Sequence, residues 1–168
     1  SSNIGSVKIA QKVGIKNYKN FLNSLDLFKK IKFDLNEVGV PLSFRWGKCK
    51  LATASFGRGV TTTPLQLARA YSILGNGGYE IKPSILSNKL NPPKKGKQII
   101  STETSDAINL MLRKVVSLNE GTAKFANIDG FDVAGKTGSS VKYINNAKLN
   151  TFVALFPSNK PKYVLLVM

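Results

Sequence analysis

Two short groups of polar residues in this sequence could take part in chemistry. Ser1-Ser2-Asn3 reads as S-x-N, and Lys136-Thr137-Gly138-Ser139 joins a cation to two hydroxyl groups. Taken singly, each group has a plainer interpretation. The first can cap a helix, and the second can be a strand relaxed by glycine with hydroxyl groups that face solvent. Neither group alone therefore establishes a site.

Residue types that are rare or absent narrow the chemistry. The 168 residues include no His and a single Cys, Cys49, which excludes a His-based metal site, a Ser-His-Asp triad and an internal disulfide framework. Any nucleophilic chemistry must therefore use Lys, and we predict neither a metal nor a cofactor. No apolar run approaches the roughly 18 residues of a membrane span, and residues 1–20 lack the layout of a signal peptide.

Helices are predicted where apolar residues recur at helical spacing. The expected helices are Ser1–Val13, capped by its Ser/Asn cluster, Asn17–Phe28, a helix from Pro64 to the glycines at Gly75, and a helix capped by Ser101. The last helix is expected to bury Ile108, Met111, Leu112, Val115 and Val116. The stretch from Lys32 to Gly59 has no sustained period, so we predict an irregular connection there.

Three strands are predicted in the last third of the chain. They are Phe131–Gly135, Thr151–Phe156 and Lys162–Met168, divided by the turn segments Tyr143–Asn146 and Pro157–Pro161. Short turns favour antiparallel pairing, and helices followed by strands indicate an α+β fold in which helices pack on an antiparallel sheet. The length and the 42% of apolar residues fit a single domain over residues 1–168.

Together, in this order and far apart, the two polar groups resemble two of the three signatures of penicillin-binding proteins and serine β-lactamases, S-x-x-K, S-x-N and K-T-G. Ser55–Tyr71 also looks like the "S-x-G-x-G…TPLQLA" segment of class B penicillin-binding proteins, and Gly121–Lys124 leading to Gly130–Gly138 is similar to theirs. The likeness covers essentially the whole chain. It implies the penicillin-binding transpeptidase fold, which is serine β-lactamase-like, incomplete at both ends.

The resemblance implies a role for each residue of the K-T-G group. Lys136 would place a cation near the terminal carboxylate of the substrate, and the hydroxyl groups of Thr137 and Ser139 would bind that carboxylate. The backbone N–H of Ser139 would form half of an oxyanion hole. Gly138 would let the substrate lie antiparallel along the strand, where a side chain would block its approach.

The S-x-N group would add two further residues to the site. Ser1 would relay a proton to the leaving group, and the Asn3 amide would hold a substrate carbonyl and orient a catalytic lysine. In the family the nucleophile motif S-x-x-K should precede S-x-N, and nothing precedes Ser1 here. The chain's S-x-x-K, Ser139 to Lys142, overlaps the K-T-G strand, where residues three apart point to opposite faces. We therefore expect this chain by itself to form no acyl-enzyme.

The implied parent activity is that of a peptidoglycan D,D-transpeptidase. A serine attacks the D-Ala-D-Ala bond of a stem peptide, and the amine of a neighbouring strand resolves the acyl-enzyme into a cross-link. Three stretches look closer to the septal cell-division type than to the elongation type: Phe56–Gly59, the segment around Trp46, and the ending Phe152–Met168. The parent would then act at the periplasmic face of the bacterial inner membrane, anchored upstream. Its partners would be stem peptides, β-lactams, a glycosyltransferase and division proteins.

Two other functions stay open. One is a basic nucleic-acid-binding module, since 25 basic and 9 acidic residues give a net charge of +16. The basic residues follow no single helix, and no zinc, helix-turn-helix or RNP pattern is present, so no nucleic acid is expected as a partner. The other is a catalytically inactive penicillin-fold scaffold, because the decisive serine and lysine would lie ahead of residue 1.

Overall fold

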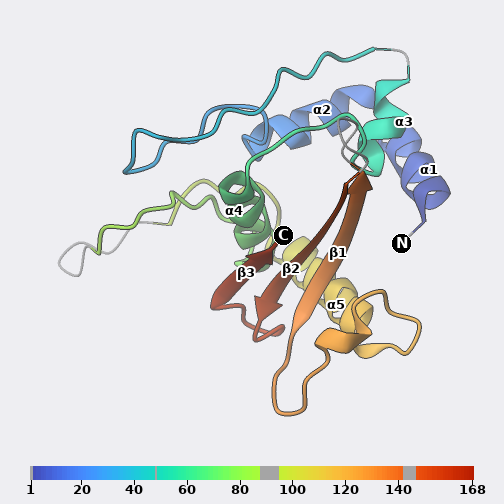
Figure 1. The fold of residues 1–168 in the computed structure, drawn as a ribbon, viewed down its shortest axis with the longest axis vertical. Helices are drawn as coiled ribbons and strands as arrows, with labels where there is room; N and C mark the ends of the chain where they lie inside the picture. Colours follow the sequence, from blue (N-terminus) through green and yellow to red (C-terminus); the bar gives the residue numbers. More distant parts are fainter. Residues whose placement is uncertain (1, 48, 88–94, 142–146) are drawn as a thin grey trace. The chain divides into compact units, whose positions relative to one another are not determined.

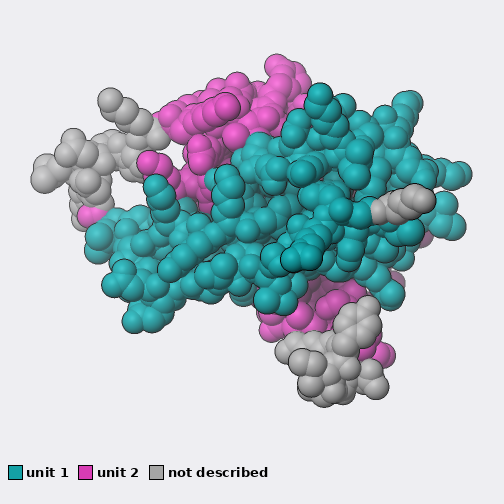
Figure 2. Space-filling model, turned by 90° about the horizontal axis from the view of Figure 1, so that it is seen from above, with its two compact units in different colours: residues 1–67, 83–86 teal, residues 68–82, 87–168 magenta. Residues whose placement is uncertain are grey.

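The computed structural model describes residues 2–47, 49–87, 95–141 and 147–168, and Figure 1 shows its helices and strands. The chain forms two compact units, which we call unit 1 and unit 2. Unit 1 contains Ser1–Leu67 and Pro83–Leu86, and unit 2 contains Ala68–Lys82 and Ser87–Met168 (Figure 2). The single domain expected over residues 1–168 stays a prediction.

Unit 1 begins with two helices joined at a glycine. Helix α1 spans Asn3–Val13, and its cap is Ser2, whose Oγ accepts a hydrogen bond of 3.2 Å from the Gly5 N–H. Gly14, at a φ of 81°, ends α1, and helix α2 follows over Ile15–Ser24. Both predicted helices are confirmed. The second ends at Ser24 rather than at Phe28, and Asp26 follows at a positive φ of 52° that a continuing helix does not allow.

The prediction of an irregular connection over Lys32–Gly59 is wrong in one part. Helix α3 occupies Lys50–Ser55 and packs against α1. The hydroxyl of Tyr18 on α2 donates a hydrogen bond of 3.2 Å to the carbonyl of Ala54, which ties α2 to the same helix. Six residues make fewer than two turns, so the sequence of α3 is too short to display a helical period.

Helix α4 spans Pro64–Gly75, as predicted, with Pro64 as its first residue. Thr63 and Gln66 form a reciprocal cap: the Gln66 N–H donates to Thr63 Oγ1 at 3.2 Å, and the Thr63 N–H donates to Gln66 Oε1 at 3.2 Å. Gln66 is 1% exposed, and its Nε2 donates to the backbone carbonyls of Asp26 and Lys29. A buried amide is therefore satisfied by the turn that follows α2.

Helix α5 spans Thr102–Ser117 and begins at Ser101, whose Oγ accepts from the Thr104 N–H at 3.2 Å, as predicted. The predicted buried side is partly wrong, because Met111 is 59% exposed. Ser105 and Asn109 are buried instead. Ser105 Oγ donates to the Leu74 carbonyl at 2.6 Å, and Asn109 Nδ2 donates to the Gly75 carbonyl at 3.3 Å. These polar side chains satisfy carbonyl groups at the end of α4, which explains their burial.

Unit 2 ends in a three-stranded antiparallel sheet with the order β1-β2-β3 (Figure 1). The strands are β1, Ala134–Val141, β2, Lys148–Phe156, and β3, Tyr163–Val167. Helix α5 packs against β1, and Ala134, Val153 and Leu155 are almost fully buried. The α+β class with helices on an antiparallel sheet is thus confirmed.

The first predicted strand is displaced along the chain. Residues 131–133 lie before β1, and the N–H of Phe131 donates to the Ile128 carbonyl at 3.0 Å in a turn. The apolar side chain of Phe131 suggested a strand that faces the core, but Phe131 is 65% exposed and is not part of the core. The predicted turn at Tyr143–Asn146 lies outside the described residues. In the described ranges, no helix is both long and apolar enough to cross a membrane.

Candidate active-site strand

The two polar groups lie in different units of the structure. Asn3 is the exposed first residue of α1 in unit 1, while Ser1 lies outside the described residues. Lys136, Thr137, Gly138 and Ser139 are consecutive residues of β1 in unit 2. Ser2, between the two S-x-N residues, is the helix cap that the plainer interpretation expects. The K-T-G group is therefore the part of the candidate site whose geometry lies within one unit.

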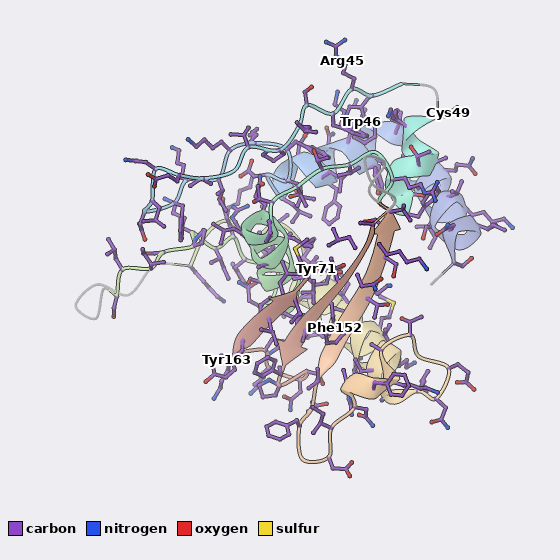
Figure 3. All side chains as sticks on the ribbon, viewed as in Figure 1. Arg45, Trp46, Cys49, Tyr71, Phe152 and Tyr163 are labelled. Carbon is purple, nitrogen blue, oxygen red and sulfur yellow. The ribbon has the colours of Figure 1, made fainter. Side chains whose placement is uncertain are left out.

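Strand β1 carries the K-T-G group at an edge of the described sheet. It pairs with β2 in a register that sets Lys136 opposite Val153, Thr137 opposite Phe152 and Ser139 opposite Asn150; Phe152 is labelled in Figure 3. Among the described residues β1 pairs with β2 alone. An edge strand presents backbone N–H and C=O groups to which an extended peptide can add as a further strand.

Lys136 is a half-buried cation on this strand. Its Nζ donates a hydrogen bond of 2.7 Å to the backbone carbonyl of Thr137, so the ammonium group stays against the backbone of the K-T-G segment. Burial makes the charged form less favourable and lowers the pKa of Lys136 from its ordinary value of 10.5. A partly desolvated cation interacts with an anion more strongly than a fully hydrated one.

Thr137 and Ser139 are two residues apart on β1, so their side chains leave the same face of the strand. Thr137 Oγ1 donates a hydrogen bond of 2.9 Å to Thr122 Oγ1, and Ser139 Oγ donates one of 3.0 Å to Asn150 Oδ1. Two hydroxyl groups on one face, on the strand that carries a half-buried lysine, form a chemically suitable set for a carboxylate.

The glycines of the strand are required by its neighbour β2. A Cβ on Gly135 would lie 2.6 Å from the ring of Phe152 and 2.7 Å from the Val153 carbonyl oxygen. A Cβ on Gly138 would lie 2.5 Å from Thr151 Oγ1. The resemblance explained Gly138 by the approach of a substrate. The structure adds close packing within the sheet as an independent reason.

An ion pair that sequence reasoning missed fixes the start of β1. Arg113 on α5 lies 2.9 Å from Asp132 and also donates to the Val133 carbonyl at 3.0 Å. Asp132 in turn accepts a hydrogen bond of 2.5 Å from the Ser158 hydroxyl. These residues are far apart in sequence, and no spacing signal links them. Thr122, in contrast, lies in the Gly121–Lys124 segment that the resemblance singled out.

Comparison with known proteins agrees with this geometry. Residues 1–168 match the family model described as "Penicillin binding protein transpeptidase domain". The chain is 33% identical over 183 residues to the probable peptidoglycan D,D-transpeptidase FtsI of Caulobacter vibrioides, and 32% identical over 185 residues to the stage V sporulation protein D of Bacillus subtilis. These matches cover 100% and 99% of the chain but 31% and 28% of the relatives. The chain thus spans about a third of their length.

Solved structures give the same result. The transpeptidase domain of penicillin-binding protein 3 from Burkholderia pseudomallei aligns with a TM-score of 0.89 at 28% identity, over 98% of this chain and 52% of that one. A mycobacterial penicillin-binding protein 3 in complex with aztreonam aligns with a TM-score of 0.85 at 25% identity, over 98% of this chain and 42% of that one. The fold, the K-T-G strand and the family match lead to one conclusion: this chain belongs to the transpeptidase family of class B penicillin-binding proteins.

Proposed function

We propose that this chain is part of a serine-type D,D-transpeptidase that cross-links peptidoglycan stem peptides through an acyl-enzyme. The observation that carries the proposal is strand β1, an edge strand of the described sheet. It bears the half-buried Lys136, and the hydroxyl groups of Thr137 and Ser139 leave one face of the strand together. Relatives named as peptidoglycan D,D-transpeptidases support the reaction class. The aztreonam complex of a structural neighbour supports β-lactams as ligands.

Each residue of strand β1 has a place in this reaction. Lys136 supplies positive potential near the terminal carboxylate of the stem peptide, and the hydroxyl groups of Thr137 and Ser139 bind that carboxylate. The Ser139 N–H stabilises the oxyanion that forms on the attacked carbonyl, an interaction whose loss slows such reactions about 10²–10³-fold. Gly138 leaves room for the extended peptide at the strand.

The S-x-N residues serve proton transfer and orientation in the same proposal. Ser1 relays a proton to the departing amine, and the Asn3 amide orients the catalytic lysine and holds a substrate carbonyl. The nucleophile belongs to an S-x-x-K motif, which in the family precedes S-x-N. Ser139 is not that nucleophile, because it lies on strand β1 rather than on a helix where Lys could approach it after one turn. Residues 1–168 alone therefore form no acyl-enzyme.

The proposed setting is the division septum. The sequence Phe56–Gly59 and the FtsI relative support the septal type, while another relative is named as a sporulation protein. The protein would act on the periplasmic side of the inner membrane, with a glycosyltransferase and division proteins as partners. Its substrate would be the D-Ala-D-Ala end of a stem peptide.

Penicillin acylation tests the proposal. We would incubate the full-length protein that contains these residues with a fluorescent penicillin, and follow the mass increase of one opened β-lactam. We expect the wild type to be labelled. Lys136→Ala should be labelled at about one hundredth of the wild-type rate or more slowly still, because a preorganised charge at the site is lost. Lys148→Ala, which removes an exposed lysine from the neighbouring strand β2, is the matched control and should react like the wild type. A full-length wild type that takes no label would favour the inactive scaffold.

A further inference from the structure

We propose that Thr122 is a positioning residue that allows Thr137 to bind a carboxylate without breaking its internal hydrogen bond. The inference rests on the proposed function and extends its anion-binding site by one residue outside β1. Thr122 lies in the turn that follows α5, and its Oγ1 is 2.9 Å from Thr137 Oγ1. Both residues belong to unit 2.

A count of hydroxyl protons carries the inference. A carboxylate accepts hydrogen bonds, so a hydroxyl binds it by donating its one proton. Thr137 donates its proton to Thr122, and in the described part of the chain the Thr122 proton meets no acceptor. The pair therefore holds two protons and one internal bond. If Thr137 turns its proton to a carboxylate, Thr122 turns to donate to Thr137, and no hydrogen bond is lost.

Ser139 lacks this freedom. Its hydroxyl donates to Asn150 Oδ1 at 3.0 Å, and an amide oxygen accepts only. If Ser139 turns its proton to a carboxylate, the bond to Asn150 breaks. The Thr122–Thr137 pair is thus better suited than Ser139 to donate to an anion, although all three hydroxyl groups lie at the surface or close to it.

The backbone holds Thr122 in place. The N–H of Gly121 donates to the Leu118 carbonyl at 2.9 Å, and the N–H of Ala123 donates to the Val115 carbonyl at 3.2 Å. A Cβ on Gly121 would lie 2.2 Å from the Val115 carbonyl oxygen, so the turn packs directly against the end of α5. Ala123 is 4% exposed. The Thr122 hydroxyl is therefore presented to β1 by a fixed turn.

The test compares Thr122→Val with Thr122→Ser in the full-length protein that contains these residues. Acylation by a penicillin is followed at increasing concentrations, so that binding and the acylation step are measured separately. We expect Thr122→Val to weaken binding about tenfold, the effect of one hydrogen bond, with little change in the acylation step. Thr122→Ser should restore binding. Thr102→Val, at an exposed threonine on the first turn of α5, is the control.

A double-mutant cycle separates this role from a merely structural one. In a Thr137→Val background, Thr122→Val should have no further effect on binding, because Thr122 acts through Thr137. Equal binding by wild type and Thr122→Val, failure of Thr122→Ser to restore it, or full additivity with Thr137→Val would each overturn the inference while the proposed function stands. A wild type that takes no label would overturn the proposed function, and this inference with it.

Discussion

The side chain of Arg113 lies 2.9 Å from the carboxylate of Asp132, and this ion pair joins helix α5 to the segment directly before strand β1. Arg113 also donates to Asn127 Oδ1 and to the Val133 carbonyl, each at 3.0 Å. One guanidinium group thus holds three points of the chain that leads from α5 to the K-T-G residues. The fixed position of β1 depends on contacts well outside the motif.

Asp132→Asn is expected to lower the free energy of unfolding by about 1–2 kcal/mol, because it weakens a charged hydrogen bond that is only partly exposed. Asp129→Asn is the matched control, since Asp129 is also exposed, lies three residues earlier and makes no ion pair among the described residues. Urea denaturation of the full-length protein that contains this segment measures both. Equal midpoints for the two variants would show that the Arg113–Asp132 pair does not stabilise the fold.

Gly121→Ala is expected to destabilise the turn that presents Thr122. The new Cβ would lie 2.2 Å from a backbone oxygen, which cannot rotate away, and we expect a loss of about 3 kcal/mol. Gly130→Ala is the comparison, because Gly130 has a positive φ of 80° with nothing within 4 Å of its added Cβ. Strain of the left-handed backbone alone costs about 1–2 kcal/mol. Thermal denaturation that ranked Gly130→Ala as the more damaging change would contradict this steric argument.

The sequence predicted those elements that carry strong local signals. Pro64 at a helix start and Ser101 as a helix cap fix α4 and α5 through contacts within a few residues, and both helices begin where expected. The buried side of α5 was predicted only in part, because the polar Asn109 is buried there. Its Nδ2 donates a hydrogen bond to the Gly75 carbonyl, 34 residues away. No periodicity argument contains such a partner, so an exposed Met111 took its place in the prediction.

The candidate site divides in the same way. Its residue types are readable as a motif, but the strand predicted there covered Phe131–Gly135, whereas residues 136–139 lie in β1, Ala134–Val141. The Thr122–Thr137 hydrogen bond and the contact that excludes a Cβ at Gly135 depend on how the turn after α5 and strand β2 approach β1. These distances arise from tertiary packing, which residue spacing does not encode.

Lys136 is expected to react with an amine-directed reagent at lower pH than a free lysine does. Burial lowers its pKa from 10.5, so a larger share of its amine is neutral and nucleophilic below that pH. Stability should rise as pH increases through the interval between the lowered pKa and 10.5, because the unfolded chain holds the proton longer. Labelling at several pH values, read by peptide mass, gives the midpoint for Lys136. The same protein in urea is the control, with a midpoint near the ordinary value, and an unchanged midpoint on folding would contradict the prediction.

Gly138 has two reasons to be glycine, and a pair of variants separates them. Gly138→Ala should lower stability by about 1–3 kcal/mol, because its Cβ would lie 2.5 Å from Thr151 Oγ1. Thr151→Ala removes that oxygen, so the double variant should recover most of the stability in thermal denaturation. Penicillin acylation should stay slow in the double variant, since the added methyl group still occupies the strand along which the substrate is proposed to lie. A double variant that is as stable and as rapidly acylated as the wild type would mean that packing against β2 is the whole requirement at this position, and that the ligand does not lie close to Gly138.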